Sequence, residues 1–244
     1  MLLSELLATP DLEPALRGLK IAGLTADSRM ARDGFVFFAI PGHAGDGMSY
    51  VPDAASRGAS VVVAPRRADS PLPLVVVDDV RRALALAAAR FFSRQPSTIA
   101  AVTGTSGKTS VVAFLRQIWA ALGHDAASLG TVGIVDSHGA QYGALTTPGP
   151  VELHRTLDEL AGRGVTHLAM EASSLGIDQR RLDGVRVDVA GFTNFSRDHL
   201  DHHASMEEYF AAKMRLFETL LHVGQTAVID ADSDVASRVV DICR

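Results

Sequence analysis

The residues with the clearest chemical meaning lie in segment 103–110, which reads TGTSGKTS. A tight turn with two glycines is followed directly by Lys108 and Thr109. In that order, backbone N–H groups can surround a phosphate, the lysine can reach its terminal oxygens, and the threonine hydroxyl can bind Mg²⁺. The usual motif has its first glycine at the position of Val102. We therefore predict a shorter variant of a phosphate-binding loop, the alternative being a glycine turn that only closes a βα unit.

Two elements must position this loop. The apolar, β-branched run 99–102 predicts a buried strand immediately before it. Apolar residues recur with helical spacing between 112 and 122, which predicts a helix that ends at Gly123. A helix that begins at the loop directs its N–H groups and the positive end of its dipole toward a bound anion.

A carboxylate and a histidine cluster are further candidates for chemistry. Glu171 follows a predicted strand over 166–170, where it could reach the neighbouring loop and bind Mg²⁺, or simply be a surface glutamate. Residues 199–203 contain His199, Asp201 and two more histidines, which is compatible with a transition-metal site or with a solvated polar loop.

Three cations also stand out. Lys213 lies on a predicted helix over 206–221, where an ordinary lysine would be solvated. Arg180 and Arg181 are adjacent and could together bind a phosphate or a carboxylate, although most surface arginines are merely solvated.

Alternating strand and helix patterns indicate an α/β fold. We expect a small N-terminal α/β domain over 1–93 and a doubly wound, mostly parallel, P-loop ATPase-like central domain over 94–244, separated by a linker near Pro96. In the second domain we expect one strand over 129–135, a turn or hairpin over 136–143 and a last strand over 227–230.

Composition excludes several classes of protein. Hydrophobic residues make up 47% and charged residues 21%, which is typical of globular chains. A net charge of −5 gives no basic face for nucleic acid, and the single cysteine, Cys243, excludes an internal disulfide. The N-terminus does not read as a signal peptide and no apolar run could span a bilayer. We therefore expect a cytoplasmic protein with neither membrane nor nucleic-acid partners.

Four segments in order resemble the Mur ligases of peptidoglycan synthesis: TGTSGKTS, LTTPGP, MEASSLGIDQRRL and NFSRDHLDHHASMEEYFAAKMRLF. The N-terminal segment LTADSRMARDGFVFFAIPGHAGDGMSYVPDAASRGA resembles the MurE branch in particular. That branch adds a diamino acid to UDP-N-acetylmuramoyl-L-alanyl-D-glutamate (UDP-MurNAc-L-Ala-D-Glu). The resemblance covers nearly the whole chain, and it implies a further C-terminal, amino-acid-binding domain that we do not expect within these 244 residues.

The resemblance implies roles for single residues in ATP binding, Mg²⁺ binding and substrate binding. The ATP loop would comprise Thr103, Gly104, Thr105, Ser106, Gly107, Lys108, Thr109 and Ser110. The catalytic residues would be Lys108, His199 and a carbamylated Lys213, and the metal ligands Thr109, Glu171, His199 and Lys213. The substrate would contact Ala26, Ser28, His43, Ala44, Gly45, Thr146, Thr147, Ser173, Gln179 and Arg181.

The resemblance also implies a reaction. ATP would phosphorylate the glutamate carboxylate of UDP-MurNAc-L-Ala-D-Glu, and the amine of a diamino acid, meso-diaminopimelate rather than lysine, would attack the acyl phosphate. The enzyme would be a monomer that needs ATP and Mg²⁺. Two other interpretations stay open: a truncated, inactive chain that binds nucleotide and UDP-sugar, and a P-loop phosphohydrolase that uses the histidine cluster.

Overall fold

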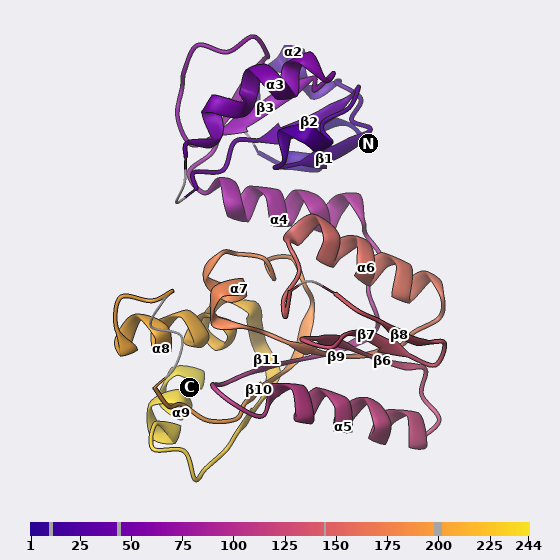
Figure 1. Ribbon diagram of the computed structural model, residues 1–244, viewed down its shortest axis with the longest axis vertical. Coiled ribbons are helices and arrows are strands. Elements are labelled where there is room, and N and C mark those ends of the chain that lie inside the picture. Colours follow the sequence, from indigo (N-terminus) through magenta and orange to yellow (C-terminus); the bar gives the residue numbers. More distant parts are fainter. Residues whose placement is uncertain (10–11, 43–44, 144, 198–201) are drawn as a thin grey trace. The chain divides into compact units, whose positions relative to one another are not determined.

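The computed structural model describes residues 1–9, 12–42, 45–143, 145–197 and 202–244, and divides into two compact units, Met1–Ser93 and Arg94–Arg244. Figure 1 shows each unit as a sheet with helices packed against it. Each unit is described separately below. No helix among the described residues is both long and apolar enough to cross a membrane.

The first unit contains a four-stranded sheet in the order β1-β2-β3-β4, with every neighbouring pair parallel. Its strands are β1 (Gly23–Thr25), β2 (Phe35–Phe38), β3 (Val61–Ala64) and β4 (Leu74–Val76). Its helices are α1 (Leu3–Leu7), α2 (Pro14–Arg17), α3 (Val51–Ser56) and α4 (Val80–Phe91), with short 3₁₀ turns η1 (Ser28–Met30) and η2 (Gly47–Tyr50).

Both faces of this first sheet are buried, which explains the continuous apolar run of β2. Phe37 packs in a cluster with Val51 and Ala54 of α3, while Val36 and Phe38 point to the opposite face and are fully buried there. A parallel sheet with both faces covered requires apolar residues at successive positions rather than at alternate ones.

The second unit contains a seven-stranded sheet in the order β11-β10-β5-β9-β6-β7-β8. The strands are β5 (Thr98–Thr103), β6 (Ala126–Gly130), β7 (Gly133–Asp136), β8 (Gly139–Gln141), β9 (His167–Glu171), β10 (Val187–Phe192) and β11 (Leu221–Ile229). The helices are α5 (Lys108–Ala121), α6 (Pro150–Gly162), α7 (Ser174–Asp178), α8 (Met206–Arg215), a π-helical turn η3 (Leu216–Leu220) and α9 (Ala236–Cys243).

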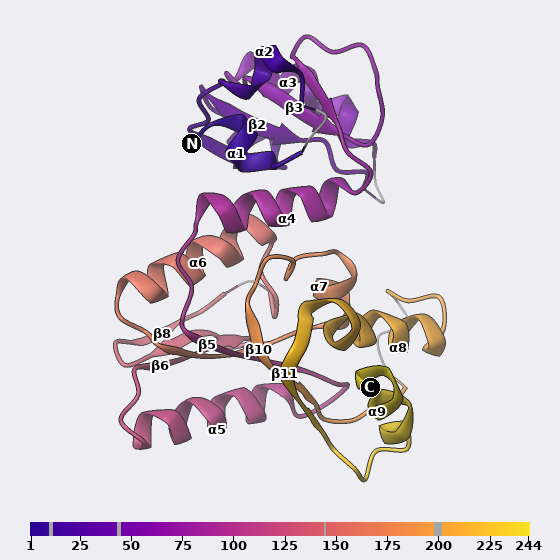
Figure 2. The same cartoon turned by 180° about the vertical axis from the view of Figure 1, so that it is seen from behind.

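Helices cover both faces of this second sheet, as Figures 1 and 2 show for α5 on one side and α6 on the other. Leu168 and Met170 of β9 face the cluster that contains Leu157 of α6. Ala169, between them, faces Val112 of α5. Strand β11 forms one edge of the sheet, and β8 forms the other at the end of two antiparallel pairs.

The mostly parallel, doubly wound sheet is as expected, but several boundaries differ. The single strand expected over 129–135 is wrong: Thr131 and Val132 form a turn between antiparallel β6 and β7. The segment 136–143, expected to be a turn or hairpin, contains β8, which pairs antiparallel with β7 to form a hairpin. The α-helix expected to reach residue 221 ends at Arg215 and continues as the wider π-helical turn η3, and the last strand begins at Leu221 instead of residue 227.

Candidate functional site

The loop between β5 and α5 has the geometry of an anion-binding turn. Gly104 has φ +140° and Gly107 has φ +84°, both in the region that favours glycine. A Cβ on Gly104 would lie 2.0 Å from the Thr193 hydroxyl, so the close approach to β10 also requires glycine there. The N-terminal end of the 14-residue helix α5 follows at once and brings its first N–H groups and a positive dipole end to the loop.

Asn194, two residues after the end of β10, holds this loop from the side of the neighbouring strand. Its backbone oxygen accepts from the Thr105 N–H and its side-chain oxygen from the Ser106 N–H, both at 2.9 Å. Its amide donates to the Ser106 carbonyl at 3.2 Å. The sequence analysis did not assign Asn194 a role, although its position at the end of a strand matches that of Glu171.

Two lysines reach the same carbonyl of the loop. The Lys108 ammonium donates to the carbonyls of Gly104 and Thr105, each at 2.9 Å. The Lys213 ammonium comes from α8, lies 2.8 Å from the Gly104 oxygen and is 4.3 Å from the centroid of the Tyr209 ring. Lys213 is only 1% exposed, so it is not the solvated lysine that its helix alone would suggest.

Glu171 is the last residue of β9. This strand lies between β5, which leads into the phosphate loop, and β6, which leads into Thr131. Glu171 is 1% exposed, and its Oε1 accepts from the Thr109 hydroxyl at 3.0 Å and from the Thr131 N–H at 2.9 Å. The Thr131 hydroxyl donates to Oε2 at 3.3 Å. Because β5, β6 and β9 are parallel neighbours, the segments that follow them meet at the same edge of the sheet.

These residues line one cavity of about 430 Å³. Its lining consists of Thr105, Ser106, Gly107, Lys108, Thr109, Thr131, Thr146, Glu171, Ser173, Ser174 and Lys213. Cationic, hydroxyl and carboxylate groups therefore converge with the opening of a helix, an arrangement that can hold a polyphosphate together with a hard cation.

Other members of the expected ATP loop lie elsewhere. Thr103 is fully buried at the end of β5, and its hydroxyl has no hydrogen-bond partner within the described residues. Ser110 is exposed on the first turn of α5. Neither lines the cavity.

His199 and Asp201 lie outside the described residues. His203, the last histidine of the cluster, is 6% exposed, and its Nε2 lies 3.0 Å from the Ser174 hydroxyl. No group of three or more histidine, cysteine, aspartate or glutamate residues is arranged to hold a metal in the parts that are described.

A smaller cavity of about 160 Å³ shares Thr146, Ser173 and Ser174 with the first. Thr147 and Arg181, two of the expected substrate contacts, also line it. Arg181 donates to the Thr147 carbonyl at 2.7 Å and to the Gln179 side-chain oxygen at 2.7 Å, which places the guanidinium against both. The expected substrate residues of this unit therefore gather beside the phosphate loop.

The remaining expected substrate residues belong to the first unit. Ala26 and Ser28 follow β1, and Gly45 follows β2, so they lie at the carboxyl-end edge of its parallel sheet. Ser28 is 6% exposed, and its hydrogen bond to Asp53 is the main cause that lowers the pKa of that carboxyl. His43 and Ala44 lie outside the described residues.

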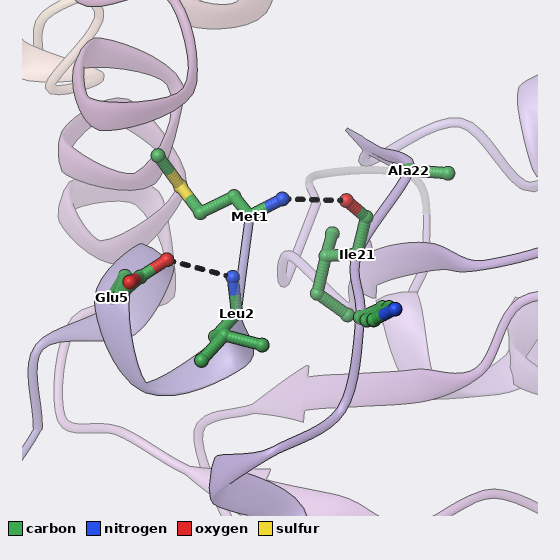
Figure 3. A pocket seen from close by; sticks show the side chains of 6 residues that line it. Met1, Leu2, Glu5, Ile21 and Ala22 are labelled. Carbon is green, nitrogen blue, oxygen red and sulfur yellow. Dashed lines mark hydrogen bonds between the residues drawn. The ribbon is translucent and has the colours of Figure 1, made fainter.

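The first unit also has a cavity of about 380 Å³, shown in Figure 3, that none of the expected site residues lines. It lies between the Met1–Leu2 segment and the Lys20–Ala22 segment. The Met1 amine donates to the Ile21 carbonyl at 3.4 Å, and the Leu2 N–H donates to the Glu5 carboxylate at 2.9 Å.

Comparison with known protein families agrees with this arrangement. A model described as "Mur ligase middle domain" matches residues 102–243, and one described as "Mur ligase family, catalytic domain" matches residues 20–92. The chain belongs to the Mur ligase family. The first match includes the phosphate loop and α8, and the second includes the segments that follow β1 and β2.

Curated relatives in this family carry the name UDP-N-acetylmuramoyl-L-alanyl-D-glutamate–2,6-diaminopimelate ligase. The protein of Bradyrhizobium diazoefficiens is 53% identical over 96% of this chain and 48% of its own length. That of Agrobacterium fabrum is 54% identical over 93% of this chain and 46% of its own. A solved structure with the same name has a TM-score of 0.87 at 27% identity, over 99% of this chain and 49% of that one. The chain thus spans about half the length of these relatives.

Proposed function

We propose that this chain forms the UDP-sugar-binding and ATP-binding part of an ATP-dependent amide-bond ligase. Residues 1–93 would bind the uridine end of UDP-MurNAc-L-Ala-D-Glu, and residues 94–244 would bind ATP. The observation that carries the proposal is the single cavity where Lys108, Glu171 and Lys213 converge on a glycine loop. The names of relatives at more than 50% identity support meso-diaminopimelate as the added diamino acid.

The phosphate loop is the proposed ATP site. Loop N–H groups and the start of α5 would face the β- and γ-phosphates, and Lys108 would exchange its contacts with Gly104 and Thr105 for phosphate oxygens. Phosphoryl transfer depends mainly on positioning and on offsetting negative charge, so a lysine beside the transferred group is the expected arrangement.

The oxygen-rich wall of the same cavity fits Mg²⁺. The Thr109 hydroxyl and the Glu171 carboxylate lie 3.0 Å apart there, and both are ligand types that Mg²⁺ prefers. We infer that Thr109, Glu171, His199 and Lys213 would hold the metal. Bound Mg²⁺ would offset the negative charge of the phosphates during transfer.

Lys213 would serve as a ligand after carbamylation, which converts its cation into an anion. Its burial beside the loop supports a role in the site rather than in solvent contact. Incubation with ¹³C-labelled bicarbonate followed by ¹³C NMR should give a carbamate signal that is lost in Lys213→Met.

The ligation would proceed through an acyl phosphate. The glutamate carboxylate of UDP-MurNAc-L-Ala-D-Glu would attack the γ-phosphorus of ATP, and ADP would leave. The amine of the diamino acid would then attack the acyl carbon, and phosphate would leave as the amide forms. Thr146, Thr147, Ser173, Gln179 and Arg181 line or adjoin the smaller cavity and would orient the substrate peptide.

A second candidate function is binding of both ligands without turnover. The cavities described above are assigned to ATP and to the substrate peptide, and none is assigned to the diamino acid. Calorimetry with ATP and UDP-MurNAc-L-Ala-D-Glu, together with a ligation assay with diaminopimelate, separates the two. Amide product supports the ligase, and binding of both ligands without product supports the second candidate.

Lys108→Ala tests the ATP site. Removing one charged hydrogen-bond donor costs about 1.5–3 kcal/mol, so ATP affinity should fall about 10- to 100-fold in calorimetry. Lys20→Ala is the matched control because Lys20 is an exposed lysine of the other unit. Unchanged ATP affinity in a folded Lys108→Ala protein would contradict the proposed site.

A further inference from the structure

We propose that Thr131 is a positioning residue that fixes the carboxylate of Glu171 for its metal and connects it to the loop at Thr146. This inference rests on the function proposed above, because it assigns a new residue to the same cavity. Thr131 lies in the turn between β6 and β7, a segment without a recognisable motif.

Thr131 contacts both oxygens of the carboxylate at once. Its backbone N–H donates to Oε1 at 2.9 Å and its hydroxyl donates to Oε2 at 3.3 Å. A carboxylate held at both oxygens cannot rotate about its terminal bond without losing a contact. The orientation of Glu171 is therefore set by the turn after β6.

Gly130 provides the space for this arrangement. A Cβ on Gly130 would lie 2.1 Å from Oε1 and 2.6 Å from the carboxyl carbon of Glu171. The carboxylate thus packs directly against the backbone that leads into Thr131. This tight packing, with a side chain that is 1% exposed, leaves Glu171 little freedom to adopt another rotamer.

The hydroxyl protons along this wall have a defined direction. A threonine hydroxyl has a single proton, and the Thr131 proton goes to Glu171, which as a carboxylate can only accept. The Thr131 and Thr146 hydroxyl oxygens lie 3.0 Å apart, and Thr146 is the donor in that pair whenever Thr131 donates to Glu171. A chain of hydrogen bonds then runs from Thr146 through Thr131 to Glu171.

The Thr109 hydroxyl also donates to Glu171, with its oxygen 3.0 Å from Oε1. The lone pairs of the Thr109 oxygen therefore point away from the carboxylate. A metal ligand and its orienting partner would then be fixed before a cation arrives. Partners that orient a ligand typically change metal affinity about 10- to 100-fold when they are removed.

The test measures how ATP binding depends on Mg²⁺. Thr131→Val removes the hydroxyl, keeps the shape and keeps the backbone N–H contact. We would titrate the protein with a non-hydrolysable ATP analogue in a calorimeter over a series of Mg²⁺ concentrations. The Mg²⁺ concentration that gives half of the maximal affinity, called the Mg²⁺ midpoint, should be about tenfold higher for Thr131→Val than for wild type. Affinity in the absence of Mg²⁺ should be unchanged. Thr131→Ser should restore the wild-type midpoint, and Thr219→Val, at an exposed threonine of the same unit, should leave it unchanged.

Thr146→Val tests the connection. It should raise the midpoint about two- to threefold, and the double variant should be no worse than Thr131→Val, because both changes interrupt one chain of hydrogen bonds. Additive effects would overturn the connection.

A Mg²⁺ midpoint within twofold of wild type in Thr131→Val would overturn the positioning role while leaving the ATP site intact. Equal losses with and without Mg²⁺ would also overturn it, because Thr131 would then act on the nucleotide or on the fold. Failure of the wild-type chain to bind the analogue at any Mg²⁺ concentration would overturn the proposed function and this inference together.

Discussion

Gly104 is the residue of the phosphate loop that packs against Thr193, which directly follows β10. It combines a positive φ of +140° with a position where a Cβ would collide with the Thr193 hydroxyl. Gly123, at the end of α5, also has a positive φ, of +86°, but no atom lies within 4 Å of a Cβ there. A substitution at Gly123 therefore introduces backbone strain alone, whereas one at Gly104 introduces backbone strain and a steric clash.

Gly104→Ala should lower the free energy of unfolding by about 2–3 kcal/mol and abolish ATP binding, because strain and overpacking act together. Gly123→Ala should cost only about 1 kcal/mol and leave binding intact. Urea denaturation and calorimetry measure both effects. Equal stability losses in the two variants would show that contact with Thr193 is unimportant.

At the scale of elements, a buried ion pair ties α8 to the segment after α7. The Arg215 guanidinium lies 2.7 Å from the Asp183 carboxylate, and these side chains are 13% and 3% exposed. Arg215 is two residues from Lys213, and Asp183 is two residues from Arg181. The pair therefore joins the helix of the proposed ATP site to the segment that lines the proposed substrate cavity.

Arg215→Met should destabilise the second unit by about 3–5 kcal/mol, because it removes the Arg215 guanidinium from a carboxylate that is only 3% exposed. The double variant Asp183→Leu/Arg215→Met should lose less stability than Arg215→Met alone. Arg155→Met, which removes an exposed pair with Glu159 at 4.0 Å, is the control and should change stability by less than about 0.5 kcal/mol. A loss in Arg215→Met as small as in this control would contradict the expectation.

The elements that the sequence predicts well are those with a strong local pattern. The apolar run of β5, the two loop glycines and the periodic α5 all indicate one structure. Strand β6 reads AASLG, too small and too polar to indicate a buried strand, and its pairing with β9 and β7 makes it one. Thr131 lies inside the strand predicted over 129–135, so its position in the turn after β6 could not be inferred from the sequence. Asn194 shows the same limit, because its contacts with the loop join residues 88 or more positions apart.

At the scale of the whole molecule, the two units require separate probes of stability. A chain with two compact units need not unfold in a single step. The single tryptophan, Trp119, lies on α5 and so reports on the second unit. The Trp119 ring centroid is 5.1 Å from that of His167, so the intensity of Trp119 fluorescence depends on this neighbour as well as on folding. The midpoint of denaturation is therefore a better measure of stability than the intensity itself.

His154 should make the second unit sensitive to acid. It is fully buried on α6, where burial lowers its pKa from 6.5 to about 4. Because the unfolded chain binds this proton more readily, stability should be complete above pH 6.5 and fall as the pH drops toward 4, by about 3 kcal/mol in all.

Urea midpoints from Trp119 fluorescence at pH 7 and pH 4.5 measure this loss. His154→Gln should show a clearly smaller decrease than wild type, whereas His222→Gln, at an exposed histidine, should keep the full decrease. An unchanged decrease in His154→Gln would assign the acid sensitivity to other groups.

Strand β11 pairs with β10 along one side only, and much of its length is exposed, including Val223 and Val228. Among the described residues no second strand pairs with β11, and an edge strand of this kind can pair with another extended chain. At the high protein concentrations used for crystallisation, molecules would therefore tend to join through this strand. Crystals of the chain would then contain a continuous sheet that crosses from one molecule to the next.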